Sequence, residues 1–161
     1  MTPISGERPD GPGNPAGVCH DGVILPASED ASCGYHDIGS HCVEQINYWR
    51  AKEGLPPFER LADAEACAAR EARLALEAGK SHYNDGCGWR SQASSGGGRG
   101  GDGSNGTVLL SVDWLPKLIY NEGPDGGHYQ AMMTPYPRAV ACGYFASDRD
   151  NHRILINYYN L

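Results

Sequence analysis

The chain has 161 residues, a length that fits one domain with a core of its own. Its 22 glycines and 11 prolines predict long loops. Thirteen basic and twenty acidic side chains give a formal net charge of −7, which argues against a nucleic-acid partner or an anionic membrane surface. No apolar run is long enough to span a membrane, and the lack of a sequence period excludes collagen and coiled coils.

Residues 1–39 are rich in glycine, proline, serine and aspartate and show no sustained helical or strand period. We expect them to form an irregular N-terminal arm, with the folded domain over residues 40–161. No signal peptide is visible, because the run Val23–Leu25 is too short for its hydrophobic region. An exported protein would therefore carry its signal outside this chain or use another route.

Two helices are expected in the first half of the domain. One begins at Ser40, a suitable N-cap residue, and ends before Gly54. Its apolar stripe consists of Val43, Ile46 and Trp49 or Arg50. The second helix covers residues 63–78, and one of its faces carries mostly small side chains, which allow close packing against another layer. That face consists of Ala64, Cys67, Ala68, Glu71, Ala75 and Ala78.

Residues 86–106 are predicted to form a flexible surface loop. Seven glycines lie in the second half of this segment, and no phosphate-binding context surrounds them. A third helix is expected over residues 107–121, with Leu115 and Ile119 on its apolar stripe. Pro116 is expected to kink or split this helix, because proline cannot donate a backbone hydrogen bond.

The last part of the chain predicts a short helical turn over residues 127–133 and then two strands. The strands are expected over residues 138–146 and 153–159, joined by a hairpin turn at 147–151. Helices followed by a terminal hairpin indicate an α+β layered domain rather than a βαβ repeat.

Three side chains have the chemistry of a metal site or an acid–base site. His82 follows a helix end, and His128 opens the short helical turn six residues after Glu122. The turn-rich segment between Glu122 and His128 can bring the carboxylate beside the imidazole. Two imidazoles and a carboxylate suit a divalent transition metal, and the same groups are candidates for general acid–base catalysis. The simpler alternative is that these histidines are ordinary polar residues.

No activated nucleophile is predicted. Ser81 precedes His82 directly, but adjacent residues seldom reach Ser–His geometry, and no Gly-x-Ser-x-Gly elbow occurs. An even number of cysteines without a Cys-x-x-Cys pair favours a disulfide framework and an oxidising compartment over a zinc site. Cysteines that form disulfides have no free thiolate to act as a nucleophile. The cysteines are Cys19, Cys33, Cys42, Cys67, Cys87 and Cys142.

Four segments in chain order resemble motifs of the CAP superfamily, which unites cysteine-rich secretory, antigen 5 and pathogenesis-related class 1 proteins. Residues 42–50 resemble its first-helix His-Asn-x-x-Arg segment, with Ile46 in place of the histidine. Residues 127–133 resemble the signature Gly-His-Tyr-Thr-Gln-x-Val-Trp. Residues 140–143 resemble the strand Val-Gly-Cys-Gly, and residues 156–159 resemble the closing Cys-Asn-Tyr.

The resemblance implies a three-layer α-β-α sandwich with a small, mostly antiparallel sheet, long loops and a large open cleft. In many members two histidines and two glutamates line the cleft, and some bind zinc or another divalent ion. His82, Glu122 and His128 match three of these four positions. Gln92 aligns with the remaining glutamate (Ser94 in another register), so a neutral group replaces one anionic ligand.

Tyr83 and Tyr129 adjoin the matched histidines and are expected to line the cleft together with Gln92. The segment Tyr120–Pro124 resembles the Trp-x-Glu-Gly-Pro segment of secreted bacterial members.

Six cysteines allow fifteen connectivities, and their spacing does not choose among them. Together with the resemblance to the CAP superfamily, we expect the pairs Cys67–Cys87, Cys42–Cys142 and Cys19–Cys33.

For function, the resemblance implies a secreted, monomeric module whose cleft binds a small apolar ligand or a protein partner, with or without a zinc ion. We favour this non-enzymatic role. The alternative is a metal-dependent, peptidase-like hydrolase that uses His82, Glu122 and His128. A third interpretation is a structural surface protein, in which the polar cluster is only a hydrogen-bonded remnant.

Overall fold

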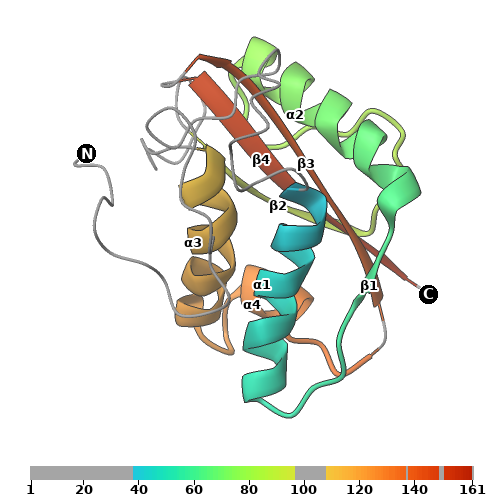
Figure 1. The fold of residues 1–161 in the computed structure, drawn as a ribbon, viewed down its shortest axis with the longest axis vertical. Helices are drawn as coiled ribbons and strands as arrows, with labels where there is room; N and C mark the ends of the chain where they lie inside the picture. The colour runs from blue at the N-terminus through green and yellow to red at the C-terminus, as the bar shows by residue number, and fades with distance from the viewer. Residues whose placement is uncertain (1–37, 97–107, 137, 149–150, 161) are drawn as a thin grey trace, which may run out of the picture.

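The computed structural model describes residues 38–96, 108–136, 138–148 and 151–160 (Figure 1). Most of the predicted N-terminal arm, including the expected Cys19–Cys33 pair, lies outside the described residues. The helices are α1 (Ile38–Lys52), the 3-10 helix η2 (Ala62–Ala64), α2 (Glu65–Ala78), α3 (Val108–Glu122) and α4 (Gly127–Met132). The strands are β1 (Glu59–Arg60), β2 (Ser91–Ser95), β3 (Arg138–Asp148) and β4 (Asn151–Asn160).

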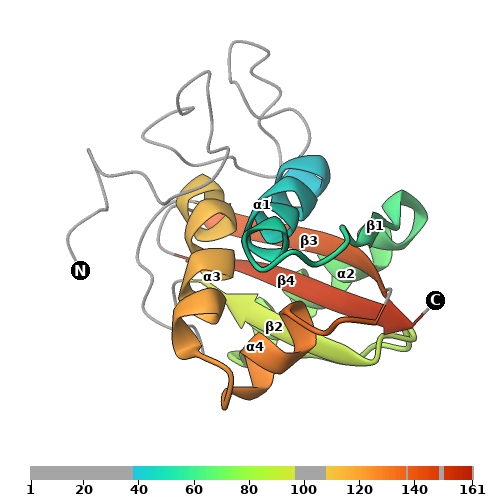
Figure 2. The same ribbon diagram turned by 90° about the horizontal axis from the view of Figure 1, so that it is seen from below.

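The four described strands form one mixed sheet in the order β1-β3-β4-β2. The β3–β4 hairpin is antiparallel, β2 pairs antiparallel with β4, and the short β1 pairs parallel with β3. Helix α2 covers one face of the sheet, whereas α1 and α3 cover the other (Figure 2). The α+β class and the three-layer arrangement are therefore confirmed.

The two helical layers are packed as the side-chain patterns predict. On α1, the residues Val43, Ile46 and Trp49 are buried in the core. On α2, which contacts β3 and β4, Ala68 and Ala75 of the small-residue face are fully buried, whereas Ala78 at the end of the helix is exposed. Gly143 of β3 permits this close approach, because a Cβ atom there would collide with the backbone of Ala68 and its neighbour.

Two disulfides within the described part of the chain connect the layers and loops. Cys42–Cys142 joins α1 to β3 across the core, over a sequence separation of 100. Cys67–Cys87 joins α2 to the loop that follows it, over a separation of 20 residues. Both expected pairs are confirmed: the first ties the α1 layer to the sheet, and the second ties α2 to the loop that follows it.

Three expectations about local structure were wrong. Residues 91–95, expected within a loop, form β2, because the backbone from Ser91 to Ser95 pairs with β4. Helix α1 begins at Ile38, so Ser40 lies inside the first turn and is not the N-cap. Pro116 does not split α3, which runs as one helix from Val108 to Glu122, because the proline costs one backbone hydrogen bond while Leu115 and Ile119 on either side of it pack into the core.

Candidate functional site

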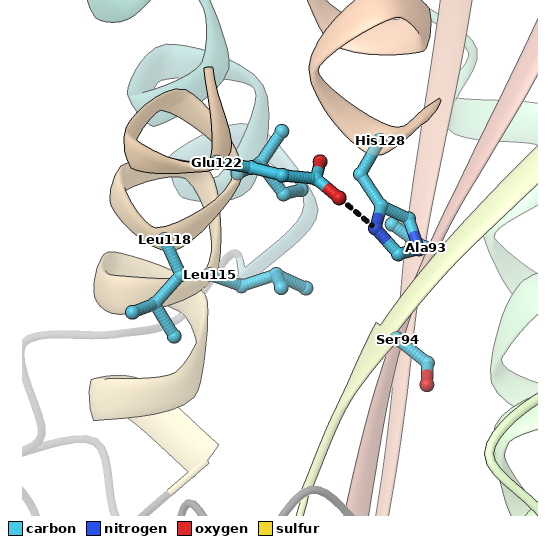
Figure 3. Close-up of a pocket in the computed structure, with 7 residues that line it drawn as sticks. Ala93, Ser94, Leu115, Leu118, Glu122 and His128 are labelled. Carbon is cyan, nitrogen blue, oxygen red and sulfur yellow. Dashed lines mark hydrogen bonds and ion pairs between the residues drawn. The ribbon is translucent and has the colours of Figure 1, made fainter. Parts of the chain in front are cut away.

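A pocket of about 220 Å³ lies between α3, α4 and β2 (Figure 3). Leu115 and Ile119 of α3 and Ala93 of β2 belong to the hydrophobic core and give the pocket an apolar wall. Leu118, which is 49% exposed, extends this apolar surface to the outside. Among the residues that the structure describes, the lining is Ala93, Ser94, Leu115, Leu118, Ile119, Glu122 and His128. The pocket is therefore apolar along α3 and polar at its α4 end.

The polar end is made by Glu122 and His128. Glu122 is the last residue of α3, and a tight turn that begins at Gly123, with φ of 87°, leads the chain back into α4. Figure 3 shows the carboxylate pointing toward the imidazole, with Nδ1 of His128 3.2 Å from Oε1 of Glu122. The other carboxylate oxygen accepts a hydrogen bond of 2.9 Å from the backbone N–H of Tyr129. Gly126 allows this arrangement, because a Cβ atom there would collide with the Glu122 side chain.

The carboxylate decides which ring nitrogen of His128 carries the proton. An ionised carboxylate can only accept hydrogen bonds, so Nδ1 of His128 is the donor to Glu122. Nε2 of the neutral ring then keeps its lone pair. With a side chain that is 54% exposed, His128 offers that lone pair to a ligand hydroxyl, a water molecule or a metal ion.

His82 lies in a different hydrogen-bond network. Its Nδ1 is 3.2 Å from Oε1 of Gln92, which also accepts a hydrogen bond of 3.1 Å from the backbone N–H of Tyr83. The Gln92 amide nitrogen donates to the Tyr83 carbonyl over 3.1 Å. Because a backbone N–H only donates and a carbonyl only accepts, these contacts determine the orientation of the amide. His82 therefore donates through Nδ1 as well.

Glu71 is the centre of this second network, although its place in the sequence indicates only a position on a helix face. It is fully buried and accepts hydrogen bonds from the backbone N–H of Asp85 at 2.7 Å and from the Trp89 indole at 3.0 Å. The side-chain amides of Asn157 and Gln92 donate to it at 3.0 and 3.3 Å. One signal was present in the sequence: Glu71 is the only charged residue on an otherwise small-residue face.

The candidate site residues thus fall into two groups. Glu122 and His128 share the pocket, whereas His82 and Tyr83 belong to the network around Gln92. Neither Gln92, Tyr83 nor Tyr129 is among the residues that line the pocket. Side chains alternate along a strand, so Gln92 faces α2 while its neighbour Ala93 faces α3.

The metal site expected from His82, Glu122 and His128 requires these side chains to lie close together. Within the described ranges, no three side chains of histidine, cysteine, aspartate or glutamate gather in a way that could hold a metal ion. Glu122 and His128 supply two of the three ligands that such a site needs. His82 does not join them, because its imidazole contacts the neutral amide of Gln92. The residues as arranged do not fit a metal site with three protein ligands.

Comparison with known proteins identifies the family. The family model described as "CAP: Cysteine-rich secretory protein family" matches residues 43–159, from α1 to the end of β4. A search of curated proteins found no match. In the described part of the chain, no helix has the length and apolar character that crossing a membrane requires. The match spans most of the 161 residues and includes both helical layers and the sheet, so the chain belongs to the cysteine-rich secretory protein (CAP) family.

Proposed function

We propose that this CAP protein is an extracellular binding module whose pocket holds part of a small apolar ligand that carries a neutral hydroxyl group. The observation that carries the proposal is the composition of the pocket, in which an apolar wall on α3 ends at the Glu122–His128 pair. At about 220 Å³ the pocket is smaller than the roughly 300–1,000 Å³ that enclose a drug-sized ligand. We therefore expect one end of the ligand to enter, with the remainder lying over the exposed Leu118.

Charge favours a hydroxyl over a carboxylate as the polar group of the ligand. The Glu122 carboxylate lies at the polar end of the pocket, and the whole chain has a net charge of −7. An anionic headgroup would be repelled there, whereas a hydroxyl can donate a hydrogen bond to Nε2 of His128. Fatty alcohols and sterols have this chemistry. The two disulfides support an extracellular location, because such bonds persist in oxidising compartments.

Hydrolysis is the second candidate, and one observation favours it. The Glu122–His128 pair leaves Nε2 of His128 able to act as a general base toward a water molecule. The pocket also contains one hydroxyl, that of Ser94, but Figure 3 shows it pointing away from His128. A serine nucleophile needs a hydrogen bond to its base, so the geometry supports binding better than acyl transfer.

The binding proposal is tested by titrating the protein with a long-chain alcohol and with the fatty acid of equal length at neutral pH. We expect the alcohol to bind more tightly. The variants Leu118→Gln and His128→Ala should weaken alcohol binding by about tenfold, the loss of one buried apolar contact or one hydrogen bond. His82→Ala, an exposed imidazole outside the pocket, is the matched control and should bind normally.

Equal affinity of the wild type, Leu118→Gln and His128→Ala proteins for the alcohol would refute the pocket as the binding site. An ester panel run on the same proteins tests the second candidate. Ester cleavage that is lost in His128→Ala and kept in His82→Ala would show an enzyme instead of a binding module.

A further inference from the structure

A buried arginine on α1 has no acidic partner among the residues that the structure describes. Arg50 is fully buried, and its Nε donates to the carbonyl of Pro56 over 2.8 Å. Its Nη1 donates to the carbonyls of Met132 and Thr134, both at 2.8 Å. The guanidinium carbon lies 3.6 Å from the centre of the Phe58 ring. Among the described residues no carboxylate contacts Arg50, and its Nη2 has no hydrogen-bond partner. Buried charges in proteins are normally paired, so this arrangement calls for a counter-charge.

Two further buried polar groups without partners lie on the adjoining strands. The Tyr158 side chain of β4 is 1% exposed, and its hydroxyl makes no hydrogen bond within the described part of the chain. Arg138, at the start of β3, is a half-buried residue whose Nε atom is buried and likewise makes no hydrogen bond there. In the β3–β4 register Val140 pairs with Tyr158 and Arg138 pairs with Asn160, so Arg138 and Tyr158 are diagonal neighbours on one face.

The same face of the sheet meets Arg50. The Phe58 ring, which Arg50 covers, contacts the Tyr158 ring edge-on with centroids 6.1 Å apart. Electrostatics links the three groups as well. Burial lowers the pKa of Arg50 to about 10, an effect that Tyr158 opposes and Arg138 reinforces. Burial raises the pKa of the Tyr158 hydroxyl, and the charges of Arg138 and Arg50 oppose that rise.

We propose that Nη2 of Arg50, Nε of Arg138 and the hydroxyl of Tyr158 form a binding site for a small monovalent inorganic anion of the chloride type. All three groups can donate a hydrogen bond, and two of them carry positive charge. A water molecule could accept these hydrogen bonds, but it would leave the buried positive charge without compensation. An anion accepts the hydrogen bonds and also compensates the charge. The bound anion would tie α1 to the β3–β4 hairpin. None of the three residues lines the pocket between α3, α4 and β2, so this site is separate from the proposed ligand site.

The test compares thermal unfolding in sodium chloride with unfolding in sodium gluconate at equal ionic strength, because gluconate is too large for a site between three side chains. We expect the wild-type midpoint to be about 4 °C higher in chloride when chloride is present at about ten times its dissociation constant. Arg138→Gln removes a charge and Tyr158→Phe removes a donor, and both should reduce this difference. Arg73→Gln, at a 48% exposed arginine of α2, is the matched control and should keep it.

Crystals of the wild-type protein grown in sodium bromide provide a readout that does not depend on the folding of any variant. An anomalous peak within hydrogen-bond distance of Arg50, Arg138 and Tyr158 would support the site. Density for an ordered water alone, or for a carboxylate of the chain itself, would overturn the proposal. The proposal would also be overturned if the difference in unfolding midpoint between chloride and gluconate were equal in the wild type and Arg138→Gln.

Discussion

Gln92 of β2 donates a hydrogen bond to the buried carboxylate of Glu71 on α2 over 3.3 Å. The same amide group donates to Oδ1 of Asn157 at 2.8 Å, and its oxygen accepts from the backbone of Tyr83 and faces His82. One neutral side chain therefore connects α2, the sheet and the loop that carries His82. The resemblance to CAP proteins places a glutamate at this position, and the contact with Glu71 explains why an amide suits this chain.

Replacing Gln92 with glutamate should destabilise the protein at neutral pH. The variant would place a second carboxylate beside Glu71 and remove an amide donor, at a cost of about 2–3 kcal/mol. The like charge raises the folded-state pKa of the introduced carboxyl above its unfolded value. The variant should therefore approach wild-type stability as the pH falls toward 4 and lose it as the pH rises. Urea unfolding at several pH values measures this difference.

The control for this experiment is Gln130→Glu, at an exposed position on α4. It should unfold like the wild type at every pH. If Gln92→Glu were as stable as the wild type at pH 7, the contact between Gln92 and Glu71 would not have the importance that we assign to it.

Replacing Gly126 with alanine should break the Glu122–His128 pair without unfolding the protein. The new Cβ atom would occupy the space of the Glu122 carboxylate, whereas a Cβ atom at Gly127 would meet nothing within 4 Å. Gly126→Ala should bind the long-chain alcohol about tenfold more weakly, the effect of losing the group that orients His128. Gly127→Ala is the control, and equal affinities for the two variants would contradict this account.

Replacing Gly143 with alanine should lower the stability of the whole fold. The Cβ atom would press against the backbone of α2 at Ala68, and backbone atoms cannot move aside as a flexible side chain can. We expect a loss of about 2–3 kcal/mol in the free energy of unfolding, in the range of overpacked cores. Chemical denaturation measures it, with Gly127→Ala again as the unstrained comparison. An unchanged free energy would mean that α2 and β3 can separate without cost.

Removing the two described disulfides should have unequal effects. Cys42–Cys142 closes a separation of 100 residues and Cys67–Cys87 one of 20, so the longer loop loses more entropy when it is closed. In the loop-entropy treatment the two bonds contribute about 4.7 and about 3.3 kcal/mol. The double alanine variant at Cys42 and Cys142 should therefore unfold at a lower urea concentration than the variant at Cys67 and Cys87. The reverse order would show that native-state packing, and not chain entropy, dominates.

The sequence alone determined the features that depend on neighbouring residues. Apolar periodicity located α1, α2 and the β3–β4 hairpin to within a few residues, because a helix or hairpin is selected by its own local pattern. The adjacency of Glu122 and His128 has the same origin. They lie six positions apart in the sequence, and the intervening turn allows few paths. The resemblance to CAP proteins added the two described disulfide pairs, which spacing alone did not choose.

The tertiary structure decided everything that depends on register across the sheet. Strand β2 is short and polar, with no apolar alternation of its own, and it exists because β4 offers a complete row of backbone partners. The contact between Glu71 and Asn157 spans 86 residues. Arg50 of α1 donates a hydrogen bond to the Met132 carbonyl, which lies 82 positions later in the chain. Such contacts follow from how strands pair and helices pack, and no local pattern of residues contains that information.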